Sequence, residues 1–165
     1  MIHGTPIPRQ RHGYIGVGIF HPKTEANIGT LFRSAVCFGA KFVFTVGRRY
    51  VRQSSDTTNT AGVLPLHHYA NMTDLKEHLP YACPLVGVEL TENAEPLGQF
   101  SHPETCAYLL GAEDHGLPAA IIEQCHKVVQ IGGLTSCLNV ASAGSIVLYD
   151  RWLKTRPSRI LEIAK

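Results

Sequence analysis

Two short apolar runs near the beginning of the chain flank a segment with helical periodicity. Residues Tyr14–Phe20 and Lys41–Val46 are rich in apolar side chains and have the length of buried strands. Between them, the apolar residues of Glu25–Phe38 recur three and four positions apart, which predicts an amphipathic helix stopped by Gly39. A strand, a helix and a strand in close succession predict a β-α-β unit and therefore a parallel sheet.

The alternation of strand and helix patterns continues to the end of the chain. The expected helices are Thr73–Leu79, Ala119–Cys125 and Val140–Leu153, and the expected strands are Pro84–Leu90, Cys106–Leu110 and Lys127–Ile131. Residues 47–60 and 132–139 have no periodicity and are expected to be loops, and long loops in compact domains tend to be functional. The pattern predicts an α/β fold with a mostly parallel sheet, whose ligands gather at the carboxyl ends of the strands.

Length and composition fit one globular domain. The chain has 165 residues, of which 44% are hydrophobic and 17% charged, so we expect a single domain over residues 1–165. Residues 1–13 are an expected N-terminal extension and residues 155–165 an expected basic tail. No apolar run reaches the roughly 18 residues of a membrane span, and the first residues lack the apolar core of a signal peptide. We therefore expect a soluble, cytoplasmic protein with no membrane partner.

Cysteine and histidine usage gives no sign of a metal site. The number of cysteines, five, is odd and none forms a C-x-x-C pair, which favours buried reduced thiols over disulfides or zinc ligands. The nine histidines are scattered, and the adjacent pair His67-His68 does not share a face of a strand or a helix. No metal is expected.

Charge is unevenly distributed, although the net charge is only +2. Residues 1–55 contain eight lysines and arginines against one acid, whereas residues 74–114 contain eight acids against one lysine. A basic N-terminal third and a basic tail suggest a polyanionic partner. A set of solvated faces with no partner gives the same pattern.

Three segments that follow strands or begin helices contain candidate functional residues. In the first, Gly29 and Arg33 stack four residues apart on the first helix, away from its apolar stripe. A glycine inside a helix costs about 1 kcal/mol relative to alanine, so we expect something to approach closely at Gly29, with Arg33 beside the gap. A solvated arginine on an amphipathic helix would give the same pattern.

In the second segment an apolar strand runs directly into a G-x-E-x-x-G turn. Gly111 and Gly116 would let the backbone turn sharply and lie close to a flat ligand. Glu113 and Asp114 add negative charge, which suits a cationic ligand better than a phosphate and argues against a dinucleotide or Walker-type loop. An ordinary turn is the alternative.

The third segment, residues 131–144, is a glycine-rich loop that enters a helix of small residues. Asn139 is in position to cap this helix. The small residues would permit close packing against a ligand, a threaded segment of chain or a partner subunit, and a tightly packed core helix is the alternative.

Together the three segments resemble motifs 1, 2 and 3 of the SpoU (TrmH) family in the SPOUT superfamily, over residues 14–154. Motif 1 corresponds to Asn27 and Arg33, motif 2 to Gly111, Glu113 and Gly116 with Leu117-Pro118, and motif 3 to Cys137-Leu138-Asn139-Val140. Two departures stand out, because Cys137 replaces the usual serine and the loop that begins Ile131-Gly132-Gly133 is shorter than usual.

The resemblance implies an α/β knot in which the C-terminal segment forms a trefoil. It implies a homodimer that meets through the first and last helices, each site borrowing residues across the interface. The implied reaction transfers a methyl group from S-adenosylmethionine to a ribose 2′-OH of RNA, with tRNA favoured over ribosomal RNA. A catalytically silent RNA-binding or cofactor-binding protein on the same fold is the alternative.

Residue roles follow from the same resemblance. Arg33 is expected to bind a phosphate and stabilise developing oxyanion charge, Asn27 to orient Arg33, and Glu113 to order the motif 2 loop. The implied cofactor-binding residues are Leu90, Gly111, Glu113, Gly116, Ile131, Cys137, Leu138 and Asn139. The expected RNA-binding residues are Arg9, Arg11, Arg33, Arg48, Arg49 and Arg52.

Overall fold

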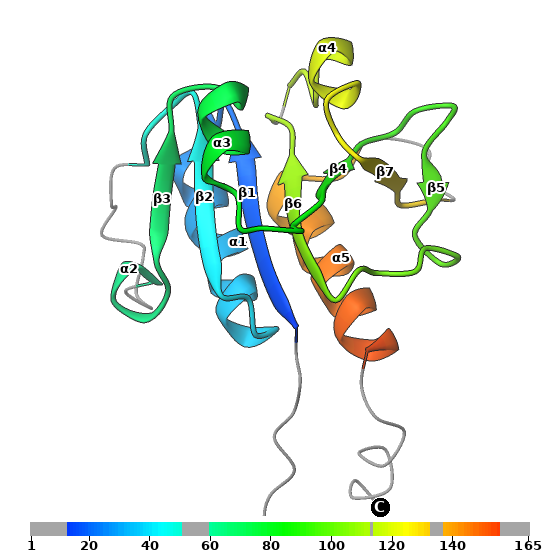
Figure 1. The fold of residues 1–165 in the computed structure, drawn as a ribbon, viewed down its shortest axis with the longest axis horizontal. Helices are drawn as coiled ribbons and strands as arrows, with labels where there is room; N and C mark the ends of the chain where they lie inside the picture. Colours follow the sequence, from blue (N-terminus) through cyan, green and yellow to red (C-terminus); the bar gives the residue numbers. More distant parts are fainter. Residues whose placement is uncertain (1–12, 51–59, 113, 133–136, 156–165) are drawn as a thin grey trace, which may run out of the picture.

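The computed structural model describes residues 13–50, 60–112, 114–132 and 137–155. Within these ranges seven strands form one sheet in the order β3-β2-β1-β6-β4-β7-β5, and every neighbouring pair is parallel (Figure 1). The strands are β1 (Tyr14–Phe20), β2 (Phe42–Val46), β3 (Leu66–Tyr69), β4 (Leu85–Val88), β5 (Glu95–Pro96), β6 (Thr105–Leu110) and β7 (Lys127–Gln130). The helices are α1 (Glu25–Cys37), α2 (Thr60–Val63), α3 (Met72–His78), α4 (Ala119–Ile122) and α5 (Val140–Lys154). The predicted α/β class with a mostly parallel sheet is confirmed, whereas the knot stays a prediction.

The expected elements are present, most of them with ends shifted by one to three residues, and three further elements were not expected. Strands β3 and β5 and helix α2 were not expected, because β3 contains two histidines and β5 has only two residues, too few to form an apolar run. Helix α4 ends at Ile122 and not at Cys125. The chain must leave the helix early because His126, just before β7, already donates its N–H to the carbonyl of Leu85 in β4 (2.9 Å). Strand β4 ends at Val88, so the two residues that follow it lie at the carboxyl edge of the sheet.

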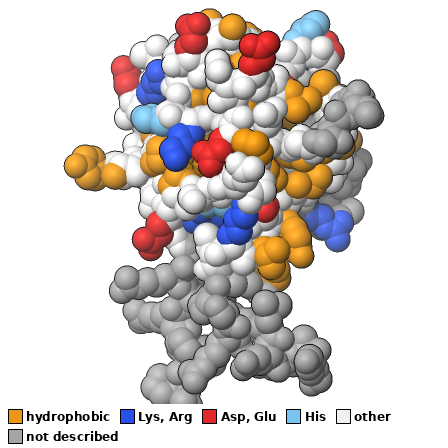
Figure 2. Space-filling view, turned by 90° about the vertical axis from the view of Figure 1, so that its right-hand side faces the viewer, with side chains coloured by type: hydrophobic (Ala, Val, Ile, Leu, Met, Phe, Trp, Pro, Cys, Tyr) orange, Lys and Arg blue, Asp and Glu red, His pale blue; other side chains and the backbone are white. Residues whose placement is uncertain are grey.

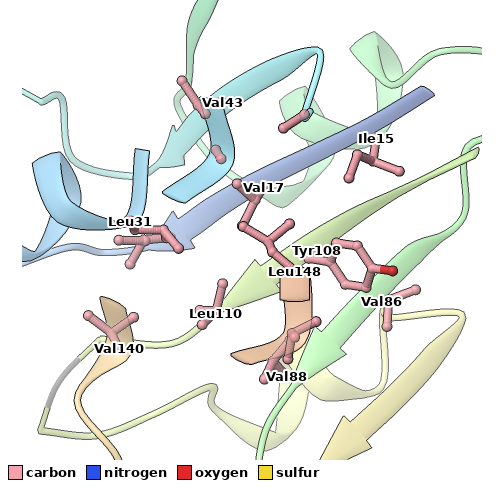
Figure 3. Packing of buried hydrophobic residues seen from close by; sticks show 14 of the residues in the cluster. Ile15, Val17, Leu31, Val43, Val86, Val88, Tyr108, Leu110, Val140 and Leu148 are labelled. Atoms are coloured by element: carbon pink, nitrogen blue, oxygen red, sulfur yellow. The ribbon is translucent and has the colours of Figure 1, made fainter. Parts of the chain in front are cut away.

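The helices cover the two faces of the sheet and enclose a separate core on each. Helices α1 and α5 lie side by side on one face and α3 lies on the other (Figure 1). Alternate residues of β1, β6 and β4 pack against α1 and α5, as Figure 3 shows for Val17, Leu110 and Leu148. The opposite core joins Phe44 of β2 to Leu75 of α3. Because both faces of the sheet are buried, the strands are apolar along their whole length.

Two glycines in β1 make room for aromatic rings on the α3 side of the sheet. A Cβ atom added at Gly16 would overlap the ring of Phe42, and one added at Gly18 would overlap the ring of Phe44. The two rings stack on each other with centroids 5.9 Å apart. The glycines therefore serve the packing of β2 and not a ligand.

The small residues of α5 allow it to lie directly against α1. A Cβ atom added at Gly144 would overlap the side chain of Leu31 in α1. One turn away, the hydroxyl groups of Ser34 and Ser145 share a hydrogen bond of 2.7 Å between the two helices. Close helix packing within one chain therefore accounts for the small residues at these positions.

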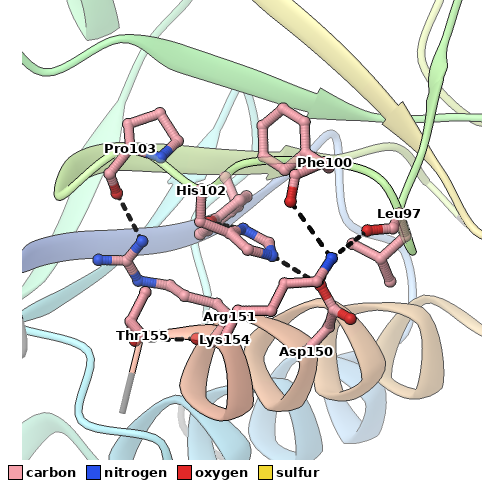
Figure 4. Close-up of polar contacts among 9 residues, drawn as sticks. Leu97, Phe100, His102, Pro103, Asp150, Arg151, Lys154 and Thr155 are labelled. Atoms are coloured by element: carbon pink, nitrogen blue, oxygen red, sulfur yellow. Dashed lines mark hydrogen bonds and ion pairs between the residues drawn. The ribbon is translucent and has the colours of Figure 1, made fainter. Parts of the chain in front are cut away.

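Polar side chains attach the end of α5 to the loop before β6 (Figure 4). The buried side chain of His102 lies between the Tyr108 hydroxyl (2.6 Å) and a carboxylate oxygen of Asp150 (2.8 Å). Burial is the main cause that lowers the pKa of His102, although Asp150 opposes it. Arg151 is also buried and donates to the carbonyl of Glu104 at 2.9 Å. These contacts fix the helix whose other end borders the candidate site.

Within the described ranges, no helix is long and apolar enough to cross a membrane. The expectation of buried cysteines holds only in part. Cys83 and Cys106 are buried and Cys125 is half-buried, whereas Cys37 and Cys137 are exposed, because one faces outward on α1 and the other lies in the loop before α5. Burial raises the pKa of both Cys83 and Cys125 to about 11.

Candidate functional site

A cavity of about 280 Å³ lies where β4, β6 and β7 end. This is the carboxyl edge of a parallel sheet, where ligands of such folds bind. The loops after the three strands and the first turn of α5 form its walls. Its lining residues are Val88, Glu89, Leu90, Leu110, Gly111, Ala112, Asp114, His115, Gly116, Ile131, Cys137, Leu138, Val140 and Ala143.

The G-x-E-x-x-G segment forms a tight turn at the rim of this cavity. The Gly116 N–H donates to the Ala112 carbonyl at 2.9 Å, and Gly116 has a positive φ of 60°. A side chain at Gly111 would overlap the backbone of Gly116. Gly111 is required because the Gly116 backbone lies where a side chain would be, and Gly116 is required because its φ is positive.

Glu89, which the sequence reasoning missed, directly follows β4 and holds this turn in place. One of its carboxylate oxygens accepts from the Leu117 N–H at 2.6 Å, and the other accepts from the Leu90 N–H at 3.0 Å. The same carboxylate packs so closely on Gly116 that a Cβ atom there would overlap it. The signal in the sequence was an acidic residue near the end of an apolar run. The expected strand Pro84–Leu90 included Glu89, whereas the observed strand ends one residue before it.

A second carboxylate, Asp114, lies on the cavity wall and is half-exposed. It pairs with Lys23, which lies in the loop between β1 and α1, and the His115 ring lies 3.3 Å away. The hydrogen bond from Lys23 is the main cause that lowers the pKa of Asp114. The Arg48 guanidinium donates to the Lys23 carbonyl at 3.3 Å, which joins the loop after β2 to the same rim.

Asn139 connects the third segment to the first. Its side-chain oxygen accepts from the N–H groups of Ala141 (2.9 Å) and Ser142 (3.3 Å), so it caps α5 as expected. Its side-chain NH₂ group donates to the side-chain oxygen of Asn27 at 3.0 Å. Asn27 and Asn139, 112 positions apart, are therefore in direct contact. Asn139, an expected cofactor-binding residue, is not among the residues that line the cavity.

Arg33 lies apart from the cavity within one chain. It is exposed on α1, six residues after Asn27 and therefore about 9 Å farther along the helix axis. The group that approaches Gly29 is the Tyr50 hydroxyl, which lies 3.6 Å from where a Cβ atom would stand, an ordinary contact distance. Tyr50 reaches this position by packing edge-on against Phe32, with ring centroids 5.8 Å apart.

The model of the SpoU rRNA methylase family matches residues 15–149, which include all three segments. The chain belongs to this family. SpoU-family enzymes are RNA 2′-O-methyltransferases that use S-adenosylmethionine (AdoMet) as methyl donor.

Two curated relatives act on different RNAs. The mouse tRNA (guanosine(18)-2′-O)-methyltransferase TARBP1 is 29% identical over 133 residues, which are 75% of this chain and 8% of the mouse protein. The 23S rRNA (uridine(2479)-2′-O)-methyltransferase of Streptomyces viridochromogenes is 27% identical over 85% of this chain and 53% of its own length. The chain thus spans about half of the bacterial relative and a small part of the mouse protein.

Two solved structures share the fold. The AdoMet-bound rRNA methyltransferase of Sinorhizobium meliloti has a TM-score of 0.76 at 21% identity, covering 90% of this chain and 59% of that one. A structure on 2′-OH methylation of C/U34 in tRNA has a TM-score of 0.71 at 20% identity, covering 86% of this chain and 91% of that one.

The family motifs meet at the cavity to different degrees. Of the expected cofactor-binding residues, six line it: Leu90, Gly111, Gly116, Ile131, Cys137 and Leu138. Glu113 lies outside the described residues. Besides Glu89 and Asp114, the cavity has lining residues that were not expected, and these are Val88, Leu110, Ala112, His115, Val140 and Ala143.

Of the expected RNA-binding arginines, Arg33, Arg48 and Arg49 are exposed, and Arg9, Arg11 and Arg52 lie outside the described residues. Arg48 and Arg49 lie in the loop after β2, in the half of the sheet away from β7 and β5 (Figure 1). Figure 2 faces the β7–β5 side, where described basic side chains stand singly among acidic and hydrophobic ones. That side offers no continuous basic surface among the residues described.

Proposed function

We propose that this SpoU-family chain binds AdoMet in the cavity at the ends of β4, β6 and β7 and methylates a ribose 2′-OH in RNA. The observation that carries the proposal is the meeting of the motif 2 turn, the motif 3 loop and the start of α5 around one cavity. Asn27 of motif 1 is joined to the same place through Asn139.

The residues present fit AdoMet. The cavity volume is near the lower end of the range for small-molecule sites, and its walls are largely apolar, as an adenine ring requires. AdoMet carries two positive charges, and Asp114 is a carboxylate on the cavity wall that can face a cation. Glu89 has both oxygens committed to backbone N–H groups, so its role is to hold the turn. Cys137 supplies a thiol where the family usually has a hydroxyl, and a thiol is a weaker hydrogen-bond donor.

Bound AdoMet supplies an already activated methyl group, so the protein mainly aligns the reacting oxygen and stabilises charge. Arg33 is our candidate for binding the neighbouring phosphate and the developing oxyanion, because a guanidinium stays protonated and is a poor base. Asn27 is our candidate for orienting this region. Glu113 would order the motif 2 loop.

We further propose that Arg33 acts in the site of a second copy of the chain. Arg33 does not line the cavity of its own chain, which supports a site completed across a dimer interface. Helix α5 exposes the apolar side chains of Ile146, Tyr149 and Leu153 at helical spacing, 39% to 49% exposed. Such a stripe is suited to a partner helix, and a homodimer through α1 and α5 would bury it.

Among RNAs, we propose tRNA as the substrate. The match to the tRNA C/U34 structure covers 91% of that chain, whereas the match to the 23S rRNA relative covers 53% of its length. Exposed Arg48 and Arg49, together with Arg9, Arg11 and Arg52, would bind phosphates, and affinity should then fall steeply with salt. Ribosomal RNA is the alternative substrate, and parallel assays with purified tRNA and rRNA separate the two.

The experiment is a methyl-transfer assay with labelled AdoMet and bulk RNA, followed by nucleoside identification. We expect label in 2′-O-methyl nucleosides, and at saturating RNA Arg33→Ala should lose transfer while binding S-adenosylhomocysteine normally. Near-normal transfer by Arg33→Ala would refute its catalytic role. Binding of cofactor and RNA by the wild type without any transfer would favour the silent RNA-binding alternative.

Mixed dimers test the shared site. Arg33→Ala has an intact cavity, and Gly111→Ala is designed to have a defective cavity with an intact Arg33. When two inactive variants are unfolded and refolded together in equal amounts, about a quarter of the wild-type sites should be restored. No restoration would mean that Arg33 acts within its own chain.

A further inference from the structure

The ion pair between Lys23 and Asp114 crosses the rim of the cavity and joins two loops that are 91 residues apart. Lys23 belongs to the loop between β1 and α1, and Asp114 belongs to the motif 2 turn. Asp114 lines the cavity, whereas Lys23 does not. The pair therefore links the cavity wall to a loop that leads into α1 and Arg33.

The Lys23–Asp114 pair is exposed to solvent, so another cation can displace Lys23 from Asp114. The side chains of Lys23 and Asp114 are 52% and 43% exposed, and exposed ion pairs contribute little to stability. Another cation that enters the cavity can therefore replace Lys23 at Asp114. Among the described lining residues, Glu89 is the other carboxylate, and both its oxygens are already bonded to backbone N–H groups.

Once released, Lys23 would stand beside a second cation, Arg48. The Arg48 guanidinium already bonds to the Lys23 carbonyl at 3.3 Å, so the two basic residues belong to one local structure. Arg49 follows Arg48 and is also exposed. A free ammonium group beside the Arg48 guanidinium can bind one more RNA phosphate.

We infer that Lys23 and Asp114 form a charge latch that couples cofactor binding to RNA binding. This inference rests on the proposed function. In the empty site Asp114 holds Lys23, and when the cationic cofactor binds, Asp114 turns to the cofactor and Lys23 turns to an RNA phosphate. By linkage, RNA binding strengthens cofactor binding by the same factor.

The test measures binding of end-labelled bulk tRNA with and without saturating sinefungin, a cofactor analogue that is cationic and transfers no methyl group. For the wild type we expect sinefungin to strengthen RNA binding about fivefold, the lower end of common coupling strengths. The slope of log K against log salt should steepen by roughly 0.7–0.9, the value for one added phosphate contact.

Three variants separate the latch from general electrostatics. Lys23→Gln should bind RNA with the same affinity and salt slope with and without sinefungin. Asp114→Asn should bind RNA tightly without sinefungin and gain nothing from it. Lys41→Gln removes an exposed lysine just before β2, at the amino end of the strands and away from the cavity, and should keep the wild-type response to sinefungin.

Calorimetry of sinefungin binding to the wild type distinguishes the possible failures. If sinefungin does not bind, the proposed function is wrong and the latch with it. If sinefungin and RNA both bind but Lys23→Gln responds to sinefungin as the wild type does, the latch is wrong and the proposed function stands.

Discussion

Replacement of Gly111 by alanine is the sharpest structural perturbation of the candidate cofactor site. A Cβ atom at this position would lie 2.0 Å from the carbonyl carbon of Gly116 and 2.3 Å from the Leu117 nitrogen. Both are backbone atoms, so no side-chain rotation can relieve the overlap. The motif 2 turn must therefore move by more than about 1 Å, and displacements of this size cost on the order of 100-fold in rate.

The assay measures S-adenosylhomocysteine binding by calorimetry and methyl transfer at saturating cofactor. We expect Gly111→Ala to lose on the order of 100-fold in transfer, with an overpacking cost of about 1–3 kcal/mol in the free energy of unfolding. Gly132→Ala is the matched control, since it lies beside the cavity-lining residue Ile131 and a Cβ atom there meets nothing within 4 Å. A Gly111→Ala protein with wild-type binding and transfer would refute the claim that this turn builds the site.

Three further variants should change the free energy of unfolding, which urea denaturation measures. Gly144→Ala should destabilise by about 1–3 kcal/mol, because the new methyl group overlaps Leu31 and pushes α5 from α1. Asn139→Ala should cost about 0.5–2 kcal/mol through loss of the α5 cap, whereas Asn139→Asp keeps the cap and loses only the donor to Asn27. Because burial lowers the pKa of His102, the folded chain binds fewer protons than the unfolded chain. Stability should therefore fall as the pH drops below the ordinary histidine value of 6.5, and His102→Gln should flatten that dependence.

Each of these predictions has a result that contradicts it. Ser142 is exposed on the same helix, so Gly144→Ala should cost clearly more than Ser142→Ala, and equal costs would argue against close α1–α5 packing. Asn139→Asp should be close to the wild type in stability. A His102→Gln protein with an undiminished acid dependence would assign that dependence elsewhere, for example to His68, whose pKa burial also lowers.

Local sequence patterns predicted the elements and the motif 2 turn well, because these depend on neighbours in the chain. Tyr14–Phe20 was predicted with the observed bounds, and Asn139 caps α5 as expected. Gly111 and Gly116 form the tight turn that their spacing predicted.

What could not be predicted depends on residues far apart in the sequence. Glu89 accepts from the Leu117 N–H, 28 positions away, and Lys23 pairs with Asp114 from 91 positions away. The close approach expected at Gly29 is made by Tyr50, a residue 21 positions away whose ring packs against Phe32 of α1. Amphipathic spacing shows which face of a helix is buried in the core, but it does not show which distant side chain packs on the remaining faces.

The most direct measurement of the central claim is nucleoside mass spectrometry of RNA incubated with the purified protein and AdoMet that carries a deuterated methyl group. We predict a deuterated 2′-O-methyl nucleoside that is present with the wild type and strongly reduced with Gly111→Ala. Label on a base, or no label in any RNA while the protein binds AdoMet, would contradict it.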